Sequence, residues 1–206
     1  MRNKSNGAFT LIELIIGIAI ITLLTSVVAF NFNGSNDALV VASAGQEMAL
    51  AIRQAQVNGL SVKESGVSSG IFDYAYGAYF NTSSGQNTGY IVFIDKCSAG
   101  LQAVYDIGAS CGNGATEKIE SVTMRNSVKI SSIAICTSAG SCSTPSNAVA
   151  VSISFKRPNT DAAINFMNST GSVVSASASN AKITLISPKG KTYAVTVDRT
   201  GQILTQ

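Results

Sequence analysis

An uncharged apolar run close to the N-terminus constrains this chain more than any other feature. Residues 14–30 contain no charge, and residues 9–12 extend the apolar segment to residues 9–30, with Glu13 as its single ionisable residue. At a rise of about 1.5 Å per residue, a helix of this length measures about 33 Å and crosses a hydrocarbon core of about 30 Å. The run therefore predicts a membrane-spanning helix.

The residues on either side of the run set its orientation. Arg2 and Lys4 precede it, and Asn31-Phe32-Asn33-Gly34 follows it without the small-x-small site that ends a secretory signal. The positive-inside rule places the N-terminus in the cytoplasm and the remaining residues on the outer side. We expect a single-pass protein.

Glu13 is the unusual residue of the run, because a carboxylate in an apolar segment costs free energy unless something compensates it. Near the membrane edge its side chain can reach the interface or become protonated. The sequence around it, Gly7-Ala8-Phe9-Thr10-Leu11-Ile12-Glu13-Leu14, resembles the type IV prepilin signature. In that family a prepilin peptidase cuts before a residue, usually Phe, that stands four places ahead of a glutamate, and methylates the new amine.

The resemblance implies a leader of residues 1–8, cleavage between Ala8 and Phe9, and N-methylation of Phe9. The residue before the cut is usually Gly, whereas here it is Ala8, and a cut after Gly7 would make Glu13 the sixth mature residue instead of the fifth. The resemblance also implies that Glu13 binds the freed amine of Phe9 in a neighbouring subunit and so fixes the axial register during assembly.

Residues 31–60 predict an amphipathic continuation of the helix. The weak helix formers of Asn31–Asn36 predict a kink or an unwound turn, with Ser35 or Asn36 capping a restarted helix. Beyond it, apolar residues recur at spacings of three and four, which predicts one stripe that packs on a sheet: Val41, Ala44, Met48, Ile52 and Ala55.

Residues 61–206 predict a β-rich domain, because Gly, Ser and Asn punctuate short β-type runs. We expect strands at 148–155 and 90–94, a strand with a bulge at Ser131–Ser132 within 128–135, and a hairpin of 183–186 with 193–197. The predicted fold class is α+β. In it, a long N-terminal helix, half transmembrane (9–30) and half amphipathic (31–60), packs on a C-terminal antiparallel sheet or sandwich (61–206).

All four cysteines, Cys97, Cys111, Cys136 and Cys142, lie beyond the span, where an oxidising compartment favours disulfides. A zinc site is the rival, but the chain has no histidine and no Cys-x-x-Cys pair. Of the three possible connectivities we favour the two local loops, Cys97 with Cys111 and Cys136 with Cys142. Free buried thiols are the remaining alternative.

Composition argues against an enzyme and against a strong attraction to nucleic acid. The net charge is +3, and removing Arg2 and Lys4 leaves 12 of the 14 basic residues against 11 acidic ones. The sequence contains no nucleophile elbow and no phosphate-binding loop, so we expect no catalytic residue, no cofactor and no metal. Loop aspartates could hold a calcium ion, but we favour surface turns as the explanation for them: Asp73, Asp95, Asp106 and Asp161.

Two further segments are similar to GspH/FimT-type minor pseudopilins. Residues 49–59 carry an Ala-Arg-x-x-Ala-like run, and residues 195–203 form a valine strand, a Thr-Gly turn and a short strand. DNA-binding FimT-like members carry Gly-Arg-x-Arg at that turn, whereas this chain has Gly201-Gln202-Ile203-Leu204, so nucleic acid is not an expected partner. A solvated face explains the basic residues of this region, Lys182, Lys189, Lys191 and Arg199.

This resemblance implies a non-catalytic minor pseudopilin of type II protein secretion. Its implied partners are the prepilin peptidase, other pilin or pseudopilin subunits and the bacterial inner membrane, with the β-domain in the periplasm or on a cell-surface filament. One alternative is a type IV pilin, major or minor, that acts in adhesion, motility or DNA uptake. Another is a membrane-anchored domain that never polymerises.

Overall fold

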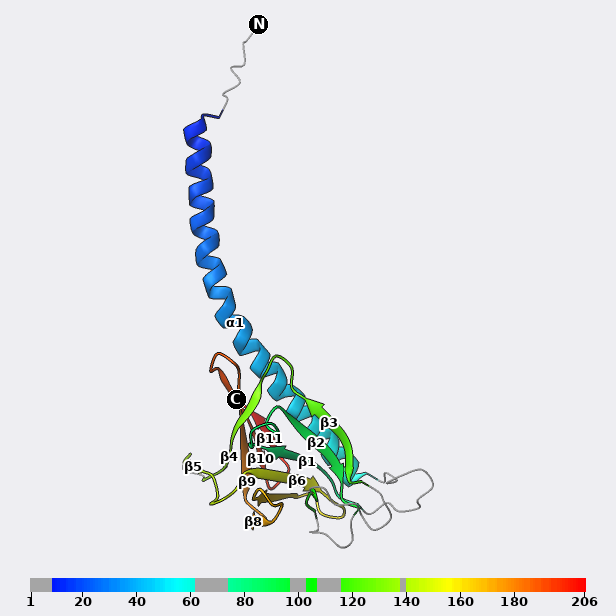
Figure 1. Ribbon diagram of the computed structural model, residues 1–206. Coiled ribbons are helices and arrows are strands. Elements are labelled where there is room, and N and C mark those ends of the chain that lie inside the picture. Colours follow the sequence, from blue (N-terminus) through cyan, green and yellow to red (C-terminus); the bar gives the residue numbers. More distant parts are fainter. Residues whose placement is uncertain (1–8, 62–73, 97–102, 107–115, 138–139) are drawn as a thin grey trace. The chain divides into compact units, whose positions relative to one another are not determined.

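The structure is a computed structural model that describes residues 9–61, 74–96, 103–106, 116–137 and 140–206, and the side chains among these except those of residues 30–35. The chain forms two compact units, Met1–Asp37 and Ala38–Gln206. Helix α1 (Leu11–Leu60) contributes to both units, and strands β1 to β11 all belong to the second. Figure 1 follows these elements along the chain, from the blue start of α1 to the red β11.

Helix α1 is helical throughout, including residues 31–36. The predicted unwound turn and restarted helix at Asn31–Asn36 are therefore wrong, and a kink there stays a prediction. Asn and Ser cost up to about 0.7 kcal/mol each, and Gly about 1 kcal/mol, relative to Ala in a helix. Restarting a helix requires a new and unfavourable nucleus, so these modest propensities do not interrupt one that continues on both sides.

The second unit contains two antiparallel sheets. The larger sheet has the order β3-β2-β1-β6-β7-β8, so β1 pairs with β2 on one side and with the distant β6 on the other. Its strands are β1 (Tyr76–Asn81), β2 (Gly89–Ile94), β3 (Lys118–Thr123), β6 (Ala150–Phe155), β7 (Ala162–Met167) and β8 (Val173–Ser175).

The smaller sheet has the order β11-β10-β9-β4-β5 and contains the predicted hairpin as β9 and β10. Its strands are β4 (Lys129–Cys136), β5 (Cys142–Ser143), β9 (Asn180–Ile186), β10 (Thr192–Asp198) and β11 (Ile203–Thr205). The register of β4 against β9 shifts between Ile130 and Ser132, which confirms the predicted bulge. The α+β fold class is confirmed.

The main core joins α1 to both sheets. Every residue of the predicted apolar stripe of α1 is buried, and Met48, Ile52 and Ala55 are fully so. They share one cluster with Phe80 and Phe155 of the larger sheet and with apolar residues of β4, β9 and β10. The three-and-four spacing therefore predicted the buried face correctly, because it matches the 3.6-residue period of a helix.

Two glycines of α1 permit this close packing. A Cβ at Gly45 would overlap the ring of Tyr193, and a Cβ at Gly59 would overlap the main-chain carbonyl of Phe155. The ring of Tyr193 can move, whereas a carbonyl in β6 cannot without disturbing the sheet. A side chain at Gly59 is therefore less well tolerated than one at Gly45.

Candidate functional site

The start of α1 is built by Thr10 and Glu13. The main-chain N–H of Glu13 donates to the carbonyl of Thr10 at 3.1 Å and lies 3.4 Å from its hydroxyl oxygen, so Thr10 occupies the N-cap position. Glu13 falls in the first turn, where the helix dipole favours a carboxylate. Its side chain is exposed, so within this unit the carboxylate is directed outward and is available to another molecule.

Phe9 precedes the helix and its side chain is 81% exposed. Ala8, the other residue of the predicted cleavage site, lies outside the described residues. Cleavage and methylation between these residues therefore stay predictions, as does the pairing of Glu13 with a neighbouring amine.

The first half of α1 presents apolar side chains on every side. The segment Leu11–Ala29 has a mean hydropathy of 2.6, and its length and composition suffice to cross a membrane. Each large apolar side chain between Leu11 and Val28 is at least 53% exposed. The hydroxyl of Thr22 donates to the carbonyl of Ala19 at 2.9 Å, and that of Thr25 donates to Ile21 at 2.8 Å. This surface leaves few polar groups for water to solvate and suits lipid or other helices.

Comparison with protein families identifies this segment. Residues 3–29 match the family model described as the prokaryotic N-terminal methylation motif. The match supports a membrane-anchored protein of the type IV pilin kind, and the methylation motif implies processing by prepilin peptidase and assembly with other pilin subunits. No curated protein and no solved structure matched the chain.

Beyond the methylation motif, the other predicted site residues fall in the second unit. Cys136 and Cys142 form a disulfide bond that joins β4 to β5, in agreement with one of the two local loops. Cys97 and Cys111 lie outside the described residues. Among the described part of the chain, no three His, Cys, Asp or Glu side chains are grouped so that they could hold a metal ion.

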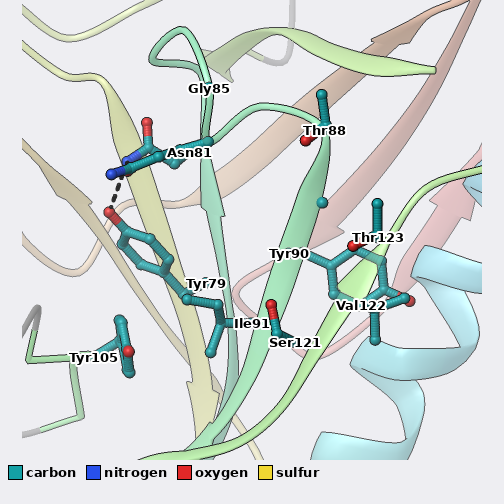
Figure 2. A pocket seen from close by; sticks show the side chains of 12 residues that line it. Tyr79, Asn81, Gly85, Thr88, Tyr90, Ile91, Tyr105, Ser121, Val122 and Thr123 are labelled. Atoms are coloured by element: carbon teal, nitrogen blue, oxygen red, sulfur yellow. Dashed lines mark hydrogen bonds between the residues drawn. The ribbon is translucent and has the colours of Figure 1, made fainter. Parts of the chain in front are cut away.

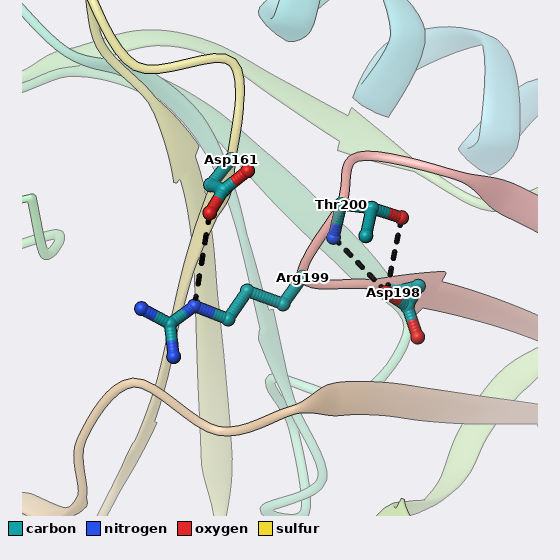
Figure 3. A network of polar contacts seen from close by, with 4 residues as sticks. All are labelled: Asp161, Asp198, Arg199 and Thr200. Carbon is teal, nitrogen blue, oxygen red and sulfur yellow. Dashed lines mark hydrogen bonds and ion pairs between the residues drawn. The ribbon is translucent and has the colours of Figure 1, made fainter.

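The loop aspartates do not form one site. Asp161 lies 4.0 Å from the Nε of Arg199, and Asp198 accepts hydrogen bonds from the N–H and hydroxyl of Thr200, both at 3.0 Å (Figure 3). Asp95 and Asp106 lie near each other elsewhere, and Asp73 is outside the described residues.

The basic residues near the C-terminus are also dispersed. Lys189 and Lys191 lie in the segment that connects β9 to β10, whereas Lys182 pairs with Thr196 towards the other end of the strands, where Arg199 lies. Strands of seven residues extend for about 20 Å. The residues therefore do not form one compact patch, and the Arg199 side chain is directed to Asp161.

Residues 103–106, between β2 and β3, cover the face of the larger sheet that points away from the main core. We call them the 103–106 strap. Ser154 donates to the carbonyl of Ala103 at 2.7 Å, and the N–H of Tyr105 donates to Ser152 at 3.3 Å. Val104 and Tyr105 pack with Tyr79 and Phe93 on this covered face. These contacts with the strap explain why two serines of β6, Ser152 and Ser154, are fully buried.

Two carboxylates hold the ends of the strap. The N–H of Ala103 donates to Asp95 at 2.6 Å, and the N–H of Asp106 donates to Glu117 at 2.8 Å. Burial raises the pKa of Asp95, and the nearby charge of Asp106 raises it further. The hydrogen bonds from Ala103 and with Glu117, together with Lys156, act in the opposite direction. No local pattern predicts these two hydrogen bonds, because each carboxylate lies eight or more residues from the N–H that it accepts.

A pocket of about 360 Å³ lies over one end of β1, β2 and β3, beside the strap. Strand register places Tyr79, Ile91 and Ser121 in one row across the three strands. Figure 2 shows Tyr105 beside Tyr79, and Asn81 bonded to the Tyr79 hydroxyl. The sequence did not predict this pocket, because its residues come together only when the three strands pair.

The tyrosines that line the pocket remain protonated at neutral pH. Burial raises the pKa of Tyr79, the hydrogen bond from Asn81 lowers it in part, and nearby Tyr105 raises it. Burial, with the charges of Glu47 and Glu120, raises the pKa of Tyr90 to about 12. Both hydroxyls therefore keep their hydrogens as potential donors.

Proposed function

We propose that the chain is a non-catalytic subunit of a type IV pilus-like filament, processed by prepilin peptidase and assembled through the first half of α1. The methylation motif at residues 3–29 carries this proposal. The exposed apolar surface from Leu11 to Val28 supports it, because the described residues of the chain do not cover that surface.

In this proposal the peptidase cuts between Ala8 and Phe9 and the new amine of Phe9 is methylated. The N-terminus starts in the cytoplasm and the β-domain lies in the periplasm. Glu13 then accepts the Phe9 amine of a neighbouring subunit, since its carboxylate is exposed at the start of the helix. A charge pair surrounded by apolar helices is strongly favoured over either charge alone, so the pair selects one axial position.

Within this class we favour a minor pseudopilin of type II secretion over an adhesive, motile or DNA-binding pilin. The closing hairpin of β10 and β11 has the Thr200-Gly201 turn of the resemblance, and the carbonyl of Gly201 accepts a 3.2 Å hydrogen bond from Gln56 of α1. The turn lacks the two arginines of DNA-binding members, and the remaining basic residues are dispersed.

The assembly role of Glu13 is tested by the variants Glu13→Val and Glu13→Gln, with Thr25→Val as a matched control on the same helix. Subunit in sheared filaments is quantified against subunit in the membrane fraction. We expect Glu13→Val to reduce the filament share about tenfold or more, since one partner of a buried pair is lost. Thr25→Val should assemble normally. Normal assembly of both Glu13 variants would contradict the role proposed for the carboxylate.

The abundance of the subunit separates the two filament roles. Traces in sheared filaments fit a minor subunit, whereas a dominant band in long fibres would indicate a major pilin. Presence in the membrane fraction alone would support a membrane-anchored domain that does not polymerise.

A further inference from the structure

The pocket over β1, β2 and β3 is lined by uncharged side chains. Its described lining residues contribute hydroxyl, amide, aromatic and aliphatic groups, and none of them is charged. Its volume of about 360 Å³ falls within the roughly 300–1,000 Å³ range of small-molecule sites. The lining therefore suits a small ligand without formal charge.

Asn81 fixes which groups of the pocket donate hydrogen bonds. Its Oδ1 accepts from the N–H of Ser83 at 2.7 Å, so its amide nitrogen faces the opposite way. That nitrogen donates to the hydroxyl oxygen of Tyr79 at 3.0 Å and to Oε1 of Gln86 at 2.6 Å. All three polar groups of the Asn81 amide are thereby used inside the protein.

Two donors are left over by this arrangement. Tyr79 accepts from Asn81, so its own hydrogen points out of the network, and Gln86 likewise accepts with its oxygen and keeps its two amide hydrogens. Within the part of the chain that the structure describes, neither donor has an acceptor. Tyr79 is 4% exposed, so few waters can reach its hydroxyl except through the pocket.

An aromatic wall and two hydroxyls complete the pocket. The ring of Tyr105 lies 5.1 Å from that of Tyr79, at an interplanar angle of 47°, and 5.5 Å from that of Phe93. Ser121 and Thr123 of β3 present exposed side chains across from it. An aromatic ring on one side and hydroxyls on the other suit one C–H face and the hydroxyl rim of a sugar ring.

We propose that this pocket binds an uncharged saccharide. The hydroxyl and ring oxygens of a saccharide accept from Tyr79 and Gln86, one of its C–H faces packs on Tyr105, and its hydroxyls bond to Ser121 and Thr123. A purely apolar ligand would leave both donors unsatisfied. A nucleic acid strand needs basic residues that the described lining lacks, and a peptide added as a strand would pair with β3, the edge strand of the described sheet, instead.

Saturation-transfer NMR on the full chain tests the proposal. The chain is held in lauryldimethylamine oxide micelles, because sugar-based detergents would compete for the site. The uncharged probes are maltose, cellobiose and N,N′-diacetylchitobiose at millimolar concentration, and the charged probes are digalacturonate and choline. We expect at least one uncharged disaccharide to receive saturation, and neither charged probe to do so.

Two variants locate the binding. Tyr79→Phe removes the hydroxyl and keeps the ring, and Gln86→Leu removes the amide of an exposed turn residue; each should weaken binding about five- to tenfold. Tyr193→Phe, which lies outside the pocket, should bind as the wild type does. Absence of saturation with all three uncharged probes, equal affinity in both pocket variants, or equal binding of a charged probe would overturn the proposal. The experiment requires neither cleavage nor assembly, so its outcome is independent of the proposed function.

Discussion

The two halves of α1 share one secondary structure and differ in everything around it. Up to Val28 the large apolar side chains are at least 53% exposed, whereas from Val41 to Ala55 the apolar stripe is buried. The two halves differ in how their apolar residues are distributed around the helix. Apolar residues surround the first half on all sides, which suits lipid or neighbouring helices, and they occupy one face of the second half, which suits a sheet. A single helix can therefore serve two environments.

The largest expected contrast between the halves is in core packing. Ile52→Ala should lower the free energy of unfolding by about 2–5 kcal/mol, because it leaves a cavity among α1 and both sheets. Ile20→Ala, in the exposed half, should change it by less than about 0.5 kcal/mol. Urea unfolding of the full chain in micelles, followed by tyrosine near-UV circular dichroism, measures both. Equal losses would mean that the first half also packs on the β-domain.

Glycine provides the next contrast. Gly59→Ala places a Cβ against the carbonyl of Phe155 and should cost about 1–3 kcal/mol. Gly17→Ala meets open space, and Ala is the better helix former by about 1 kcal/mol, so this variant should not destabilise the chain. The same urea titration compares them. A neutral Gly59→Ala variant would show that β6 can move away from the helix.

Hydroxyl groups give a smaller contrast. Ser154→Ala removes the donor to Ala103 in a fully buried site and should cost about 1–2 kcal/mol. Thr22→Val removes a hydroxyl that bonds only to carbonyls of its own helix, and these carbonyls lie within an intact helical ladder, so unfolding should be unaffected. Hydrogen exchange at Ala103 to Asp106 provides a second readout. Unchanged exchange in Ser154→Ala would contradict the strap contact.

The smallest expected effect is on pH dependence. Burial raises the pKa of Asp95 above its ordinary 3.8, so the folded state favours the protonated form. The stability gained from this is fully present below the ordinary pKa and is lost as the pH rises through the raised value. Asp95→Asn keeps an acceptor for the N–H of Ala103 and does not titrate. The urea midpoint of this variant should therefore fall less than that of the wild type between about pH 4 and pH 7. If the two midpoints changed equally with pH, Asp95 would not be the source of the pH dependence.

Local periodicity explains which parts of the fold were predictable. The buried stripe of α1 and the β9–β10 hairpin follow from spacing and turn residues close together in sequence. Strand β1 was missed because Tyr-Gly-Ala-Tyr-Phe-Asn does not alternate, and both of its faces are buried. Its neighbour β6 lies about 75 residues away in the chain, and no local signal encodes that pairing.

The candidate sites also differ in whether their residues are close together in sequence. The N-terminal motif is contiguous, so Phe9 and Glu13 could be named from the sequence alone. The pocket exists only after Tyr79, Ile91 and Ser121 come into one row, and each of these residues is unremarkable by itself. The error at Asn31–Asn36 has the opposite cause, since a strong local signal was overridden by helix on both sides.

Intact-mass analysis of the chain purified from membranes tests whether the chain is processed as a prepilin. We expect a chain that begins at Phe9, lacks residues 1–8 and carries the mass of one additional CH₂ on its N-terminal amine. A chain that retains Met1, or one that begins at Ala8, would contradict it.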